Sequence, residues 1–204
     1  LMKYGYTIQY VRNTLQLNQG FISADPGDTL HHPIFSDIAF YSGIAETDWS
    51  WSPAVADFDN DGWRDIIITN GYPRDVTDND FMSYRSEANR FASWSVMMEQ
   101  IPQIKIPNYV YHNTGKAVFE DVTTAWGMDI PSFSNGAAYA DLDRDGDLDY
   151  IVNNINDPAF VYENTLNNGK VHPNYIRFGF DGPATNKGGL GAIVQLYQGG
   201  KLFQ

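Results

Sequence analysis

DFDNDGWRD, residues 57–65, places four aspartates within nine residues. DLDRDGDLD, residues 141–149, repeats the pattern 84 residues later with a fifth aspartate. Each stretch runs directly into an apolar, β-branched segment, IIIT or YIV, of the kind that forms strands. Because carboxylates at this spacing repel one another unless they are compensated, we expect a cation among them.

The two acidic stretches belong to a longer internal repeat. The segment that begins FSDIAFYSG at residue 35 aligns without a gap, through residue 70, with the segment that begins FEDVTTAWG at residue 119. A shorter signature, VRNT, YHNT or YENT, ends at residues 14, 114 and 165. The last two copies define a unit of 51 residues, and the first copy of the unit carries two inserts. A period near 50 residues is typical of propeller blades and related arrays.

Short strands make up each unit. GAAYAD leads into the second acidic stretch, LDYIVNN leaves it, and AFVYENT follows after an Asn-Asp-Pro turn. We predict an all-β fold of β-propeller-type four-stranded blades, with about two full blades and part of a third. Such rings usually carry four to eight blades, so we expect this chain to be part of a longer protein or of a larger surface assembly.

An amphipathic helix is predicted within one of the inserts, from about residue 79 to residue 100. Thr77 or Asp78 can cap its start, and Pro102 ends it. We expect this helix to lie across a rim or face of the stacked sheets. The other insert, FISADPGDTLHHP, has the composition of a surface loop. The apolar stripe of the helix is formed by Phe81, Tyr84, Ala88, Phe91, Ser95 and Met98.

The chemistry of the acidic stretches favours Ca²⁺, which takes six to eight oxygen ligands in flexible geometry. In each stretch a glycine at position six permits a sharp turn, and position seven offers a backbone carbonyl. An EF-hand is excluded, because position twelve is Ile68 or Val152 where that loop needs a glutamate. There are two alternatives to Ca²⁺. One is Mg²⁺, which prefers fewer carboxylates and more water ligands. The other is a solvated acidic turn without a metal. The predicted ligands are Asp57, Asp59, Asp61, Trp63 and Asp65 in one site and Asp141, Asp143, Asp145, Asp147 and Asp149 in the other.

Bulk composition limits the function further. The formal net charge of −12 argues against a nucleic-acid partner, and the absence of cysteine excludes disulfides and zinc–thiolate sites. No apolar run is long enough to predict a membrane span.

No catalytic grouping emerges from the sequence, and GxSxG, HExxH, GxxxxGK[ST] and GxGxxG are all missing. His112 occupies a repeat position that Arg12 and Glu163 fill elsewhere, so we interpret it as a tolerant surface position. Trp49 and Trp51 alternate along a predicted strand, where they either stack on sugars or pack between blades. We therefore predict a protein that is not an enzyme.

The repeat resembles a known family. GAAYADLDRDGDLDYIVNN and AVADFDNDGWRDIIITNG are similar to FG-GAP/VCBS-type repeats, the blades of integrin α-subunit propellers and of many bacterial surface proteins. The last 40 residues resemble the start of an ASPIC/UnbV module. The resemblance implies Ca²⁺ in both acidic turns, carried onto the four aspartates at positions one, three, five and nine of each. Asp147 is an additional aspartate, and its side chain is expected to point to solvent.

Four segments follow from this reading. Residues 1–34 form the end of a preceding blade and a loop insert, 35–112 a blade with the helical insert, 113–164 a second blade, and 165–204 the start of the ASPIC/UnbV-like module. The predicted function is that of a calcium-binding segment of an exported, cell-surface adhesion protein whose signal sequence lies outside this chain. It binds a protein or a glycan, and Ca²⁺ acts as a structural staple. The alternative is a carbohydrate-active enzyme or its glycan-binding accessory domain.

Overall fold

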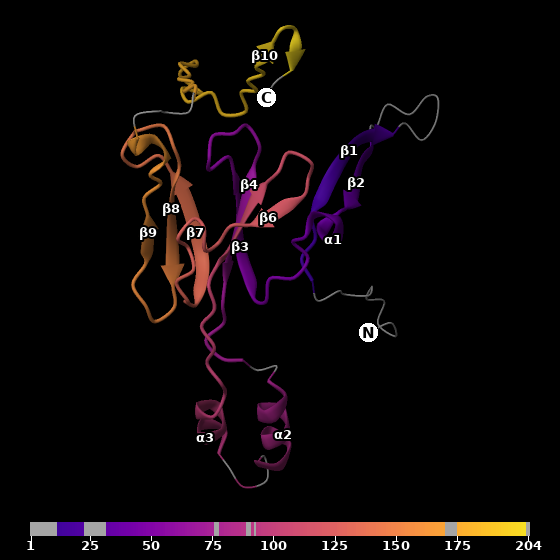
Figure 1. The fold of residues 1–204 in the computed structure, drawn as a ribbon, viewed down its shortest axis with the longest axis vertical. Coiled ribbons are helices and arrows are strands. Elements are labelled where there is room, and N and C mark those ends of the chain that lie inside the picture. The colour runs from indigo at the N-terminus through magenta and orange to yellow at the C-terminus, as the bar shows by residue number, and fades with distance from the viewer. Residues whose placement is uncertain are drawn as a thin grey trace.

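A computed structural model describes residues 12–22, 32–75, 78–88, 91, 93–169 and 175–202. Within these residues the fold is mostly antiparallel β-sheet with a few short helices (Figure 1). The strands are β1 (Gln16–Ile22), β2 (His32–Asp37), β3 (Ser50–Ala56), β4 (Asp65–Asn70), β5 (Tyr109–Asn113), β6 (Phe119–Asp121), β7 (Ser134–Ala140), β8 (Asp149–Asn154), β9 (Phe160–Tyr162), β10 (Tyr197–Gln198) and β11 (Lys201–Leu202). The helices are α1 (Ala39–Ser42), α2 (Asn79–Ala88), α3 (Trp94–Glu99) and the 3₁₀ turn η2 (Leu166–Asn168).

The first sheet has four strands in the order β3-β4-β5-β6. Every residue of β4 is buried, because β4 pairs with β3 on one side and β5 on the other while both of its faces are covered. Ile67 faces one core, whereas Ile66 and Ile68 face another. The uninterrupted apolar run that follows the first acidic turn is therefore explained by burial on both faces.

The second sheet has three strands in the order β7-β8-β9, so the prediction of a second four-stranded unit is wrong for the described residues. After β9 the chain turns into η2 instead of forming another strand. The two sheets pack through β3 and β4 against β7. Ile67 and Val110 from the first sheet and Tyr150 and Val152 from the second belong to one apolar core.

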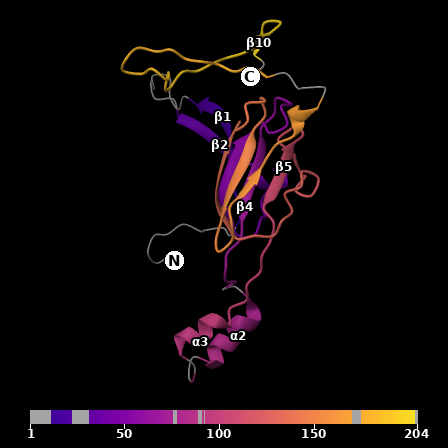
Figure 2. The same ribbon diagram turned by 90° about the vertical axis from the view of Figure 1, so that its left-hand side faces the viewer.

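A second core covers the opposite face of the first sheet. Ala39 of α1 and Ile44 lie against Ile66, Ile68 and Tyr111. The β1–β2 hairpin stands beside this core, on the side of the first sheet away from the second sheet (Figures 1 and 2). Its connection, residues 23–31, carries most of the predicted surface loop and lies outside the described residues, as do residues 1–11.

The single predicted helix is wrong, because the insert forms two helices, α2 and α3. Ser93 is extended (φ −69°, ψ 154°) immediately before α3, which interrupts any continuous helix. Phe91, a member of the predicted stripe, is 92% exposed. The start is confirmed, since the Phe81 N–H donates to Asp78 Oδ1 at 2.7 Å.

The helix pair does not lie across the sheets. In both views α2 and α3 extend beyond one end of the two sheets, at the end of β4 and the start of β5 (Figures 1 and 2). The turns between β3 and β4 and between β7 and β8 lie at the other end. None of the described helices is long and apolar enough to cross a membrane.

Hydrogen bonding groups the strands differently from the predicted segment limits. β6 pairs with β5, so the first sheet extends to Asp121, beyond the predicted limit at residue 112. The limits themselves remain a prediction. Within residues 175–202 the only strands are β10 and β11, which form a short exposed hairpin.

Candidate metal centres

Both acidic stretches form tight turns with the same backbone. Asn60 and Gly62 in the first turn have φ of 57° and 93°, and Arg144 and Gly146 in the second have 70° and 97°. Left-handed conformations at positions four and six therefore coil each chain in the same way. Asn60 Nδ2 donates to the Gly146 carbonyl at 3.2 Å, so the two turns are neighbours at one end of the sheets.

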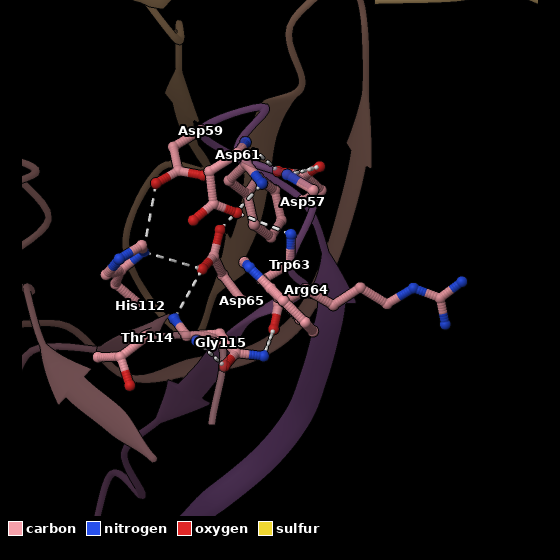
Figure 3. A network of polar contacts seen from close by, with 12 residues as sticks. Asp57, Asp59, Asp61, Trp63, Arg64, Asp65, His112, Thr114 and Gly115 are labelled. Carbon is pink, nitrogen blue, oxygen red and sulfur yellow. Dashed lines mark hydrogen bonds and ion pairs between the residues drawn. The ribbon is translucent and has the colours of Figure 1, made fainter. Parts of the chain in front are cut away.

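In the first turn, carboxylate oxygens of Asp57, Asp59 and Asp65 lie within 4.8 Å of one another, as a shared cation requires (Figure 3). The Asp61 and Gly62 N–H groups donate to Asp57 at 3.0 and 2.9 Å. Asp61 Oδ1 accepts from the Trp63 N–H at 2.7 Å. The predicted carboxylates of this turn are thus brought together and oriented by the turn's own backbone.

Asp65 has a second, structural role. It is fully buried, and its two oxygens accept from the N–H groups of Phe58 at 3.0 Å and Asn113 at 2.9 Å. Asp149 does the same in the second turn, where it accepts from the Leu142 N–H at 2.8 Å and from the Asn164 N–H at 2.9 Å. Asp65 therefore links the first turn to the end of β5, and Asp149 links the second turn to the residues just after β9.

The residues missed from the sequence include Asn113 and Asn164, which belong to the repeated Asn-Thr signature. Asn113 Nδ2 donates to the Arg64 carbonyl at 3.0 Å, and Asn164 Nδ2 donates to the Phe58 carbonyl at 2.7 Å. The sequence signal for these residues was the repetition of the signature at the spacing of the unit, because in the structure each of these asparagines packs against an acidic turn.

The second turn gathers a slightly different set. Oxygens of Asp141, Asp143 and Asp145 lie within 4.8 Å of one another. Asp141 Oδ1 and Asp145 Oδ2 are buried, and neither has a hydrogen-bond partner within the described ranges. Arg177 forms an ion pair with the other oxygen of Asp141. Unsatisfied buried carboxylate oxygens are costly, so the donor set fits a cation with oxygen ligands.

Electrostatic crowding shifts the acidity of these groups. Burial, together with the nearby charges of Asp65 and Asp61, raises the pKa of Asp59 from 3.8 to about 6. Burial is also the main cause that raises the pKa values of Asp57 and Asp65. A bound cation would reverse these shifts, because it stabilises the charged carboxylates.

The interpretation of His112 as a tolerant surface residue is wrong. Its Nδ1 lies 3.2 Å from Asp59 Oδ2 and 3.3 Å from Asp65 Oδ1 (Figure 3). Asp59, Asp61 and His112 also form a possible ligand group. The side chain reaches the turn because β5 pairs with β4, which brings residues far apart in sequence together at the edge of the first turn.

The expectation that Asp147 points to solvent is also wrong. Asp147 is 1% exposed, and its Oδ2 accepts from the Asn167 N–H at 3.0 Å. The side chain at position seven faces the segment that follows the last strand of the unit. In the first turn Trp63 faces the segment between β5 and β6, since its ring lies against Gly115.

Position twelve of each stretch lies inside a strand, Ile68 in β4 and Val152 in β8. The turns therefore lack the exiting helix of an EF-hand. Ligation by the position-seven carbonyls stays a prediction.

Comparisons with known proteins agree with this repeat. Residues 103–152 match an FG-GAP-like repeat, and residues 49–80 match an FG-GAP repeat. Two segments of the chain are therefore similar to FG-GAP repeats. The match over residues 103–152 contains the acidic turn at residues 141–149, and the match over residues 49–80 contains the acidic turn at residues 57–65. Each matched region therefore includes one acidic turn.

Curated relatives include cartilage acidic protein 1 of Homo sapiens, 38% identical over 66 residues, and its Xenopus tropicalis counterpart, 35% identical over 66 residues. The match spans 32% of this chain and only 10% of the length of either relative.

Two further features lie near the sheets. At the end opposite the acidic turns, the Trp49 ring stacks on Tyr72 with centroids 5.1 Å apart, and the Trp51 ring lies 6.2 Å from Tyr72. Trp51 Nε1 donates to the Gly71 carbonyl at 2.7 Å. Next to the first acidic turn, a cavity of about 370 Å³ is lined by Asp59, Trp126, Tyr150, Tyr162 and Glu163 among others.

Proposed function

We propose that this chain is a calcium-binding segment of an extracellular FG-GAP repeat protein, in which one Ca²⁺ in each acidic turn holds neighbouring sheets in register. The observation that carries the proposal is the pair of matching turns. Each gathers three carboxylates within cation distance and uses a buried aspartate to connect the turn to a later strand. The proposed ligands are the aspartates at positions one, three, five and nine, with the carbonyls at position seven.

The ion's effect on stability favours a location outside the cell. Extracellular calcium modules bind with Kd of about 10⁻⁴–10⁻³ M. With about 1 mM free Ca²⁺ and a Kd of about 0.1 mM, each site contributes about 1.4 kcal/mol. That contribution vanishes at cytosolic calcium concentrations, so a structural role for Ca²⁺ requires export.

The two sheets are proposed to be blades of an incomplete propeller. Their packing through β3, β4 and β7 supports side-by-side stacking, and further blades from the rest of the parent protein would continue the ring. The segment limits given above, the ASPIC/UnbV-like module from residue 165 and a bacterial source are parts of the same proposal. Their support is the sequence resemblance.

Terbium luminescence tests the metal proposal turn by turn. Tb³⁺ replaces Ca²⁺ and emits when a nearby aromatic ring transfers energy to it. Trp63 supplies that ring in the first turn, and Asp147 stands at the same position in the second. We expect Trp-sensitised emission that Ca²⁺ displaces, lost in Asp59→Ala and kept in Asp143→Ala. Emission that survives Asp59→Ala would place the ion elsewhere.

Binding of a protein or glycan partner is the proposed role of the assembled segment. The surface that favours a glycan is formed by Trp49, Trp51 and Tyr72, because partly exposed aromatic faces stack on sugar rings. This surface also supports the second candidate, an accessory domain of a carbohydrate-active protein. A glycan array with wild type and Trp51→Ala tests both, and equal binding by the two proteins would exclude this surface.

A further inference from the structure

Asp147 is a buried carboxylate with one unsatisfied oxygen. It is 1% exposed, its Oδ2 accepts from the Asn167 N–H at 3.0 Å, and its Oδ1 has no hydrogen-bond partner among the described residues. It forms no ion pair with any described residue. The charges that act on it, from Asp145 and Asp149, are both negative. Burial of such a carboxylate is unfavourable by several kcal/mol unless a positive charge compensates it.

Asn167 presents a second unsatisfied oxygen in the same place. It belongs to η2, is 3% exposed, and donates through Nδ2 to the Asp145 carbonyl at 3.2 Å. Its Oδ1 is buried and has no hydrogen-bond partner in the part of the chain that the structure describes. Asp147 Oδ1 and Asn167 Oδ1 are both acceptors, so they cannot satisfy each other. A donor or a cation is needed between the side chains.

Asp145 connects this place to the acidic turn. Its Oδ1 accepts from the Asp147 N–H at 3.2 Å, and its Oδ2 is a third buried oxygen for which no described residue supplies a hydrogen bond. A water molecule would satisfy oxygens but leave the charges of Asp145 and Asp147 uncompensated. A divalent cation with oxygen ligands satisfies both requirements.

The first repeat provides an internal comparison. The residues at the corresponding positions are Trp63 for Asp147 and Lys116 for Asn167. Trp63 is 53% exposed and Lys116 is exposed as well. The first turn therefore has no counterpart of the buried pair, and the feature is specific to the second turn.

We propose that Asp147 and Asn167, with Asp145 Oδ2, hold a further divalent cation beside the one assigned to Asp141, Asp143 and Asp145. The inference rests on the proposed function only in treating the second turn as a cation-binding turn. Such an ion ties the β7–β8 turn to η2 and so fixes the path by which the chain leaves the second sheet.

Equilibrium dialysis against 1 mM ⁴⁵Ca²⁺ tests the stoichiometry. We expect three equivalents for wild type and two for both Asp147→Asn and Asn167→Leu. Asp143→Ala keeps the further equivalent and loses the one at the turn itself. Two equivalents for wild type, or three retained in Asp147→Asn, would overturn the inference while leaving the proposed function intact. A single equivalent for wild type that is kept in Asp59→Ala and Asp143→Ala but lost in Asp147→Asn would contradict the ions assigned to the two turns and leave the further site intact.

Thermal unfolding of Asp147→Asn separates a ligand from a packing residue. The variant removes the buried charge and supplies an amide that can donate to Asn167 Oδ1. We therefore expect a higher Tm than wild type in chelator and a smaller rise in Tm on adding Ca²⁺. A residue that only packs would give a lower Tm in both conditions, and that result would contradict the inference.

Discussion

Replacing Asp65 by alanine tests the structural role of the aspartate at position nine. The fully buried carboxylate accepts two backbone hydrogen bonds, from Phe58 and Asn113, which join the first turn to the end of β5. A hydrogen bond to a charged group contributes about 1.5–3 kcal/mol, so the loss of both amounts to about 3–6 kcal/mol. Against a total of about 5–15 kcal/mol for a domain, this leaves the variant barely folded.

The assay is urea unfolding in saturating Ca²⁺, followed by tryptophan fluorescence and far-UV circular dichroism. Asp65→Asn keeps one acceptor oxygen, so we expect about half the loss of Asp65→Ala. Asp149→Ala should match Asp65→Ala, because Asp149 accepts the equivalent pair of bonds. In chelator the loss should be smaller, since the alanine variant also relieves an uncompensated buried charge.

Asp61→Ala is the matched control. Asp61 is exposed and accepts a single hydrogen bond, from Trp63, so in chelator we expect a loss of about 1 kcal/mol. If Asp65→Ala lost less than about 1 kcal/mol in Ca²⁺, the connection between turn and strand that we infer would be wrong.

Three other predictions follow from the same structure. Combined Asp59→Ala and Asp143→Ala should lower the Tm in millimolar Ca²⁺ but change it little in chelator; equal losses would argue against a metal role. In chelator, the unfolding free energy should fall as the pH rises from about 4 to about 6, because the folded pKa of Asp59 lies above 3.8 at about 6. A carboxyl group with a raised folded pKa stabilises the fold at pH values below its unfolded pKa, and this stabilisation is lost as the pH rises through the folded pKa. A rise in the unfolding free energy between pH values of about 4 and about 6 would therefore refute the assignment. Gly71→Ala should destabilise by about 1–3 kcal/mol, because φ is +118° and a Cβ would lie 2.7 Å from the Ser132 carbonyl oxygen and 2.9 Å from Phe133 Cα; a neutral result in urea unfolding would contradict the close contact.

The parts of the fold that were predictable from sequence are those in which a local pattern repeats. The acidic turns and the strands that flank them recur at a fixed spacing, and the structure has antiparallel strands on both sides of each turn. The apolar run after Asp65 predicted a strand, which β4 confirms. Local sequence suffices here because turn geometry depends on neighbouring residues.

The failures involve contacts between distant residues. His112 reaches the first turn only because β5 pairs with β4 across the helical insert, and no local pattern reports that pairing. Asp147 is buried because η2 covers it, and Asn167 lies 20 residues away. The apolar spacing of the insert continues through Phe91 and so predicts one helix, whereas the extended backbone at Ser93 divides it.

The most direct test of the account is a crystal structure of the chain grown with Ca²⁺, with an anomalous difference map. We predict a peak in each acidic turn, coordinated at about 2.3–2.6 Å by the oxygens of Asp57, Asp59 and Asp65 in one and of Asp141, Asp143 and Asp145 in the other. Ordered water without anomalous signal at both places, in crystals with ample Ca²⁺, would contradict the central claim.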